Sequence, residues 1–159
     1  MSIQIGPLSP SDRRGLEAAL RSDDTFTANE IAVALELIDD AIDNDKSDYW
    51  VRVARDDADA EIAGYICFGP TPMTKSTYDL YWIVSHTNHR GKGVAGTLIR
   101  AMETELKGLS ATAIRVETSQ TEGYGAARTL YAKYDYPETA RFKDFYRPGD
   151  DLIVYYKRL

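Results

Sequence analysis

A run of three glycines and two cations at residues 90–96 constrains this chain more than any other part of its sequence. It separates a segment rich in aromatic and β-branched residues, 78–84, from a segment whose apolar residues recur at helical spacing, 94–106. Glycine lets the backbone take positive φ and approach a ligand closely, and the first N–H groups of a helix have no internal partner. Residues 90–96 are therefore predicted to bind an anion, such as phosphate or pyrophosphate, at a helix N-terminus.

Two nucleotide-binding motifs compete for this loop. Gly91-x-Gly93-x-x-Gly96 satisfies the dinucleotide fingerprint literally, and Glu117 lies about where a ribose-binding acid is expected. Two observations argue against a dinucleotide-binding loop. The polar linker 85–90 separates the preceding strand from the first glycine, and the chain before that strand has the pattern of a β-hairpin. A Walker A loop fails because the Gly-Lys pair has no suitably spaced glycine before it and no Ser or Thr after it. An NAD-dependent oxidoreductase is therefore a minor alternative.

Length and composition predict one globular domain over residues 1–159, because 43% of the residues are hydrophobic and no region is compositionally biased. No apolar stretch is long enough to span a bilayer and no leader pattern is visible, so we expect a cytoplasmic protein without a membrane partner. The single cysteine, Cys67, fits a reducing compartment. Its strand-like surroundings favour a small core residue over a catalytic thiol.

The net charge of −6 is unevenly distributed. Residues 1–61 carry 15 acidic and 6 basic side chains, whereas residues 62–159 carry 10 and 13. The acidic part argues against nucleic acid as a partner, and the basic part contains the predicted anion site. The acidic residues are interpreted as a solvated surface, with attraction of a cationic substrate as the alternative.

Apolar periodicity and turn residues predict the element order β-α-α-β-β-β-α-β-α-β-β. The predicted strands are 3–5, 49–54, 61–68, 78–84, 111–118, 139–146 and 152–157, and the predicted helices are 12–22, 27–42, 94–106 and 125–134. A capping box is expected at the start of the second helix, 27–30, and Gly108 is expected to stop the third. This order indicates a mixed α/β (α+β) fold with an antiparallel front and a parallel crossover around the glycine loop.

Over essentially its whole length the chain resembles the GCN5-related N-acetyltransferase (GNAT) superfamily. Residues 90–95 match the acetyl-CoA signature Q/R-x-x-G-x-G/A, with Val84 and Leu98 at the usual distances before and after it. Residues 127–131 match the later helix pattern A-x-x-L-Y, and two terminal strands follow. Each motif alone is weak, but their order and spacing together are specific.

The resemblance implies a mostly antiparallel sheet of about seven strands and about four helices, splayed between its two central parallel strands. Acetyl-CoA is the expected co-substrate, with its pantetheine arm in the gap and its pyrophosphate on the glycine loop. The residues expected to contact it are Ile83, Val84, Arg90, Gly91, Lys92, Gly93, Val94, Ala95, Gly96, Tyr124 and Tyr131.

The chain departs from the family pattern at three positions. Tyr124 replaces a frequent Asn, which leaves a side-chain amide contact to the cofactor without a donor. Asp135 replaces the glycine that often follows the A-x-x-L-Y helix, and Asp tolerates the left-handed conformation required there. His86 replaces a frequent proline before the glycine loop.

The implied reaction moves an acetyl group from a thioester to a neutral amine by direct attack, through a tetrahedral intermediate. By resemblance, Tyr131 is the candidate acid for the departing sulfur and the Val84 N–H the donor to the carbonyl oxygen. Asp79 and Glu117 are the candidate bases, because both lie on strands near the expected acetyl site. His86 and His89 are read as loop residues. With two histidines, one cysteine and no recognisable ligand spacing, no metal site is expected.

The leading hypothesis is an acetyl-CoA-dependent N-acetyltransferase acting on a primary amine of a small molecule or peptide. The alternative is a CoA-binding regulatory or interaction module without turnover, since the strongest motifs concern cofactor binding. By family analogy, the first two helices and residues 144–150 border the acceptor site. Aromatic and acidic residues there suit a cationic amine. Phe142, Phe145 and Tyr146 are alternatively core residues or contacts of a homodimer formed through the terminal strands.

Overall fold

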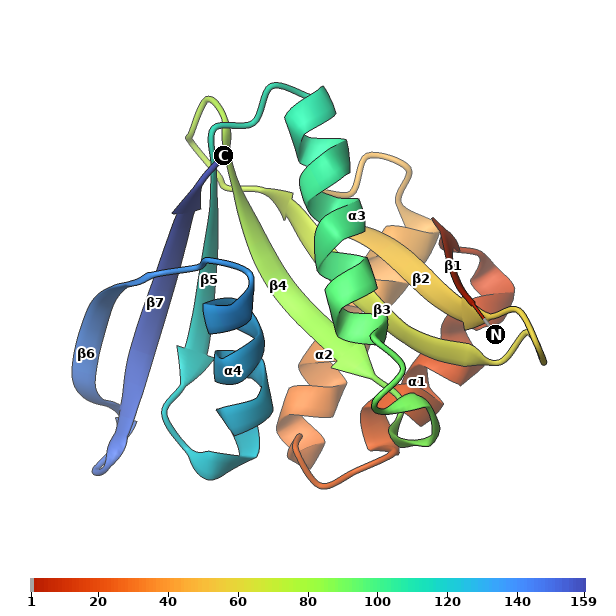
Figure 1. The fold of residues 1–159 in the computed structure, drawn as a ribbon, viewed down its shortest axis with the longest axis horizontal. Helices are drawn as coiled ribbons and strands as arrows, with labels where there is room; N and C mark the ends of the chain where they lie inside the picture. Colours follow the sequence, from red (N-terminus) through yellow and green to blue (C-terminus); the bar gives the residue numbers. More distant parts are fainter. Residues whose placement is uncertain (1) are drawn as a thin grey trace.

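The computed structural model describes residues 2–159, which form a seven-stranded sheet with helices on both of its faces (Figure 1). The strands are β1 (Ile3–Pro7), β2 (Trp50–Asp56), β3 (Ile62–Pro70), β4 (Thr77–Ser85), β5 (Ala113–Ser119), β6 (Glu138–Arg147) and β7 (Asp150–Arg158). The helices are α1 (Arg13–Arg21), α2 (Ala28–Asp43), α3 (Val94–Gly108) and α4 (Gly125–Lys133), with short 3₁₀ turns η1 (Pro10–Asp12), η2 (Thr87–His89) and η3 (Glu122–Tyr124). The predicted element order is confirmed.

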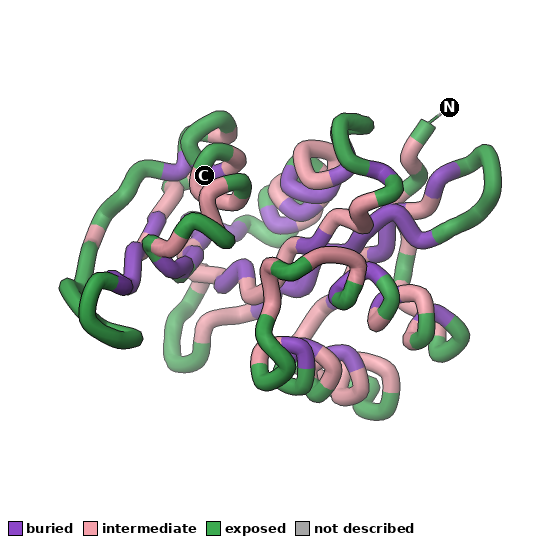
Figure 2. The backbone as a smooth tube through the Cα atoms, turned by 90° about the horizontal axis from the view of Figure 1, so that it is seen from below, coloured by how far each residue is buried: buried purple, intermediate pink, exposed green. Residues whose placement is uncertain are grey.

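The strands lie in the order β1-β2-β3-β4-β5-β7-β6, and only β4 and β5 run parallel. The mixed, mostly antiparallel fold class is thereby confirmed. The sheet separates two hydrophobic cores. One lies under α3 and α4 and includes Leu98, Met102 and Tyr131, and the other lies under α1 and α2 and includes Leu16 and Ile38. In Figure 2 the buried backbone accordingly follows the sheet and the inner sides of the helices.

The two central strands separate along their length. β4 pairs with β5 only from Thr77–Ala113 to Leu80–Val116, and the rest of each strand has no partner across the gap. Figure 1 shows β4 and β5 diverging toward the end where α3 and α4 begin. The expected splay is therefore present, and it opens beside the glycine loop.

Local sequence signals explain most element ends. The Thr27 hydroxyl accepts the Glu30 N–H at 3.2 Å and the Glu30 carboxylate accepts the Thr27 N–H at 2.9 Å, so the predicted capping box is formed. Asp135 takes φ of 65°, the left-handed conformation expected of it after α4. Gly108, in contrast, is the last residue of α3, and Ser110 takes the positive φ that ends the helix, so that boundary lies later than predicted.

β6 forms an exposed edge of the sheet. Phe142, Phe145 and Tyr146 are 53%, 58% and 47% exposed, so the interpretation of these residues as core is wrong. Phe145 packs edge-on against Tyr146 with ring centroids 5.1 Å apart. These aromatics therefore form a surface cluster at the end of the molecule that carries the β6–β7 turn. Within residues 2–159 no helix is long and apolar enough to cross a membrane.

Candidate functional site

The splay between β4 and β5 opens into a cavity of about 1020 Å³. Its walls come from the ends of β4 and β5, the first turn of α3, α4, and the segment that joins α1 to α2. Of the predicted site residues, the cavity is lined by Ile83, Val84, Arg90, Gly91, Gly93, Val94, Ala95, Gly96, Glu117, Tyr124 and Tyr131. Lys92 and Asp79 do not line it.

Gly91 and Gly93 shape the loop at one end of the cavity. Their φ angles are 78° and 75°, in the left-handed region that L side chains rarely adopt, and a Cβ on either would meet no atom within 4 Å. Gly93 is the N-cap residue of α3, which begins at Val94. The first N–H groups of the helix are thus presented at an open surface, an arrangement that suits an anion.

Gly96 has a different role from the other two glycines. It takes ordinary helical φ inside α3, and a Cβ there would collide with the Tyr134 hydroxyl at the end of α4. Its small size is therefore required for the contact between α3 and α4 rather than for loop conformation.

The two predicted phosphate cations have protein partners in this structure. Arg90 forms an ion pair with Asp23, which lies just after α1, and both line the cavity. The Lys92 ammonium instead lies 3.6 Å from Asp56 on the β2–β3 hairpin, directed away from the cavity. Arg90 is therefore the better placed of the two to meet an anion in the loop.

The free edge of β4 offers backbone donors to the cavity. The N–H of His86, just after β4, donates to the Ala63 carbonyl at 2.8 Å. Because hydrogen-bonded pairs alternate along an antiparallel ladder, Val84 also directs its N–H toward β3. The N–H groups of Ile83 and Ser85 then face the gap beside β5. The sequence pattern alone did not single out Ser85.

Tyr131 lies on α4 at the inner wall of the cavity, only 4% exposed. Its ring packs against those of Tyr155 and Tyr136, with centroids 5.2 and 6.0 Å away. The pKa of Tyr131 is raised above its ordinary value, mainly by burial and to a smaller extent by the neighbouring Tyr155. The hydroxyl therefore stays protonated across the neutral pH range.

The two candidate bases differ sharply in their surroundings. Asp79 is buried in β4 and bonded through both carboxylate oxygens to Arg115, at 2.7 and 3.1 Å. That ion pair joins the paired half of β4 to β5, so Asp79 has a structural role there. Glu117 is exposed on β5, beyond the paired segment, and lines the cavity. The structure thus brings Glu117 to the cavity and leaves Asp79 outside it.

A second group of side chains lines the other end of the cavity, and it comes largely from segments that the family resemblance placed beside the acceptor site. The Tyr124 hydroxyl donates to Glu30 of α2, so this tyrosine bridges the two sides of the cavity mouth. Asp150, 3% exposed, accepts the Ser119 hydroxyl at 2.5 Å. Burial raises the pKa of Tyr146, and the carboxylates of Glu117, Asp150 and Glu30 raise it further. These three acids come from distant segments, and Asp150 also lies 3.5 Å from the guanidinium of Arg147, which lines the same cavity.

These three acids could not be grouped from the sequence. The family analogy placed the second helix and residues 144–150 beside the acceptor site, and Glu117 was a candidate base, but no motif singled out Glu30 or Asp150.

The chain matches the model of the acetyltransferase (GNAT) family over residues 15–136. Its structure is similar to that of a Desulfovibrio desulfuricans protein assigned to the GNAT family, with a TM-score of 0.93, 30% identity and 99% of both chains covered. More distant similarities in fold include the ribosomal-protein-S18-alanine N-acetyltransferase of Escherichia coli (TM-score 0.76, 15% identity, 99% of this chain and 94% of that chain). They also include an aminoglycoside 6′-N-acetyltransferase complexed with coenzyme A (TM-score 0.75, 15% identity, 98% and 96%). No curated protein matches the chain in sequence.

Proposed function

The chain belongs to the acetyltransferase (GNAT) family, and we propose that it transfers an acetyl group from acetyl-CoA to a primary amine. The observation that carries this proposal is the cavity, which joins the glycine loop at one end to Tyr131 and Glu117 farther in. The residues fit coenzyme A, because Gly91 and Gly93 leave open space where a side chain would block a pyrophosphate. The gap between β4 and β5 offers unpaired backbone groups to the amide-rich pantetheine arm.

When bound, acetyl-CoA supplies the thioester whose acetyl group is transferred. Glu117 takes the proton of the acceptor ammonium, directly or through water, because it is the candidate carboxylate that lines the cavity. Tyr131 donates a proton to the departing sulfur, since its raised pKa keeps it protonated.

The developing negative charge on the carbonyl oxygen needs a hydrogen-bond donor. The resemblance assigned this role to the Val84 N–H, but the β3–β4 register favours the N–H groups of Ile83 and Ser85. We assign the donor to this pair, with the Val84 side chain, 4% exposed, forming part of the cavity wall.

The acceptor is an amine that carries additional positive charge. The carboxylates of Glu30, Glu117 and Asp150 line the cavity together with the aromatic rings of Phe26, Trp82 and Tyr124. Carboxylates and aromatic faces both attract ammonium groups. The S18-alanine and aminoglycoside enzymes of similar fold are named for amine acceptors of very different size, so the acids of this chain, rather than its fold, guide the choice.

A coupled assay tests this function. Purified protein is incubated with acetyl-CoA and a panel of primary amines that includes diamines, aminoglycosides and peptides with a basic residue, and free CoA thiol is measured. Thiol release that depends on a cationic amine is the expected result. Tight CoA binding by calorimetry with no thiol release for any amine would favour the alternative, a CoA-binding module without turnover.

A further inference from the structure

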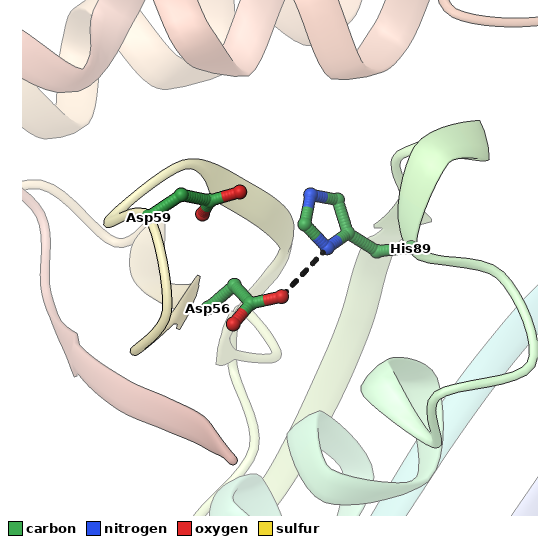
Figure 3. Close-up of side chains that lie close together, drawn as sticks. All are labelled: Asp56, Asp59 and His89. Carbon is green, nitrogen blue, oxygen red and sulfur yellow. Dashed lines mark ion pairs between the residues drawn. The ribbon is translucent and has the colours of Figure 1, made fainter. Parts of the chain in front are cut away.

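A compact group of potential metal ligands lies between the β2–β3 hairpin turn and η2; His89 of this group also lines the cavity described above, whereas the two aspartates do not. Ligand atoms of Asp56, Asp59 and His89 all lie within 4.8 Å of one another. In Figure 3 the two carboxylates and the imidazole point toward one another from the two segments. The sequence predicted no metal site, because these residues are more than thirty positions apart at their widest and meet only in the folded chain.

His89 is the unusual member of this group. Its side chain is 2% exposed, yet neither ring nitrogen makes a hydrogen bond in the described part of the chain. Nδ1 lies 3.3 Å from an Asp56 oxygen and Nε2 lies 3.5 Å from a Glu61 oxygen, but without the alignment that a hydrogen bond requires. A buried polar group normally has a hydrogen-bond partner. The imidazole of His89 lacks one among the described residues, although carboxylates lie close to it.

The charges around His89 favour a divalent cation as that partner. Asp56, Asp59 and Glu61 bring three carboxylates to this region, and the cation in contact with them is Lys92, 3.6 Å from Asp56. Among the described residues, three carboxylates therefore lie beside one lysine ammonium here. The Lys92 side chain is 31% exposed and can turn outward to solvent if another cation arrives.

We propose that Asp56, Asp59 and His89 form a binding site for a divalent transition-metal ion of the zinc type. Imidazole nitrogen combined with carboxylate oxygen is a donor set that zinc accepts, with metal–ligand distances of about 2.0–2.2 Å. Two such ligands at a tetrahedral angle lie roughly 3.4 Å apart, and the Nδ1–Asp56 separation is 3.3 Å. Asp59, exposed on the turn, needs only a small side-chain movement to complete the set.

A bound ion at this position adds a link between two segments that the β3–β4 pairing and the Lys92–Asp56 ion pair already hold side by side. Asp56 and Asp59 belong to the β2–β3 hairpin, whereas His89 immediately precedes Arg90 of the glycine loop. The metal therefore stabilises the folded chain and restrains the start of that loop.

Calorimetric titration of the chelator-treated, dialysed protein with ZnCl₂ tests the proposal. We expect one equivalent of zinc to bind with a Kd below about 100 µM, and Asp59→Asn to weaken binding at least about tenfold. Asp59 accepts the Glu61 N–H at 2.8 Å, a bond that the Asn amide oxygen preserves, so this variant should keep the turn. Asp45→Asn, at an exposed position after α2, is the matched control and should bind zinc as the unaltered chain does.

A second readout uses thermal unfolding, which does not depend on catalysis. Zinc should raise the Tm of the unaltered chain and of Asp45→Asn, and should leave the Tm of Asp59→Asn and His89→Gln nearly unchanged. Zinc binding weaker than about 100 µM, or equal binding to Asp59→Asn and the unaltered chain, would overturn the proposal.

Discussion

The two ends of the central cavity are built in different ways. At the glycine-loop end, backbone N–H groups and one arginine face the cavity, and the residues that shape it are consecutive, 90–96. At the other end, acidic and aromatic side chains come from α2, β5, η3 and the β6–β7 region, far apart in the sequence. A site made from consecutive backbone can be read from a motif, whereas a site made from converging side chains cannot.

This difference matches the division of labour that we propose. A glycine-rich helix start binds a common cofactor through atoms that every residue has, so its motif is shared throughout a family. The acceptor end depends on side-chain charge and shape, so each member can change it without altering the fold. Variants at each end should therefore alter different kinetic constants.

The largest effect is expected between the two ends, at Tyr131→Phe. Removal of the proton donor should lower kcat by about 10³-fold and change the Kd of coenzyme A far less. Burial raises the pKa of Tyr131, so the hydroxyl keeps its proton at least up to the ordinary tyrosine pKa of about 10. The activity of the unaltered chain should therefore persist to about pH 10 or above. Steady-state kinetics over pH 6–10.5 measure kcat and its pH dependence, with Tyr155→Phe as the control. An unchanged kcat in Tyr131→Phe would remove this residue from the mechanism.

Glu117→Gln should lower kcat/KM by about 10²-fold at pH 7, where most of the amine is protonated and needs a base. The deficit should shrink as pH rises, because a growing fraction of the amine is then already neutral in solution. A rate profile from pH 6.5 to 10 checks this trend, with exposed Glu36→Gln as the matched control. A loss that stays constant with pH would show that Glu117 binds the acceptor rather than deprotonating it.

Gly93→Ala tests the backbone-built end. A non-glycine residue at φ of 75° costs about 1–2 kcal/mol, and the new methyl group enters the open space of the loop. We expect the Kd of coenzyme A to rise about 30-fold. Gly108→Ala is the control, because its Cβ also meets no atom within 4 Å but its φ is not positive. Equal Kd values for the two variants would argue against this loop as the pyrophosphate site.

The smallest effect is expected for Glu30→Gln, at the acceptor end. Glutamine can keep the capping box with Thr27, so the change removes charge and spares the helix start. The KM of a dicationic acceptor should rise about fivefold, with that of a monocationic acceptor and of acetyl-CoA unchanged. Initial-rate measurements with a diamine and its monoamine analogue make the comparison. Equal changes for the two amines would mean that Glu30 does not select for charge.

Much of the fold could be predicted because its signals are local. Alternating and helical apolar patterns located the strands and helices, and Thr27, Gly93 and Asp135 marked ends whose conformations the structure confirms. The end of α3 was placed too early because Gly108 suggested a stop, although Ser110 carries the positive φ. A glycine permits that conformation, but tertiary packing decides which residue adopts it.

The contacts that individual side chains make were less predictable from the sequence. Lys92 was assigned to the phosphate, yet it pairs with Asp56 on a hairpin that the motif does not include. Asp79 and Glu117 were equivalent candidates by position, and only the pairing of β4 with β5 separates them. The paired half gives Asp79 an arginine partner, and the splayed half leaves Glu117 open to the cavity.

The sequence by itself determined the order of elements, the position of the glycine loop and the family, because these depend on periodicity and on consecutive residues. Only the tertiary structure decided which carboxylate faces the cavity, that Glu30, Glu117 and Asp150 converge on it, and that His89 lies buried among hairpin acids. Such groupings depend on the register and divergence of strands. No local pattern encodes them, because contacts between distant segments exist only after the chain has folded.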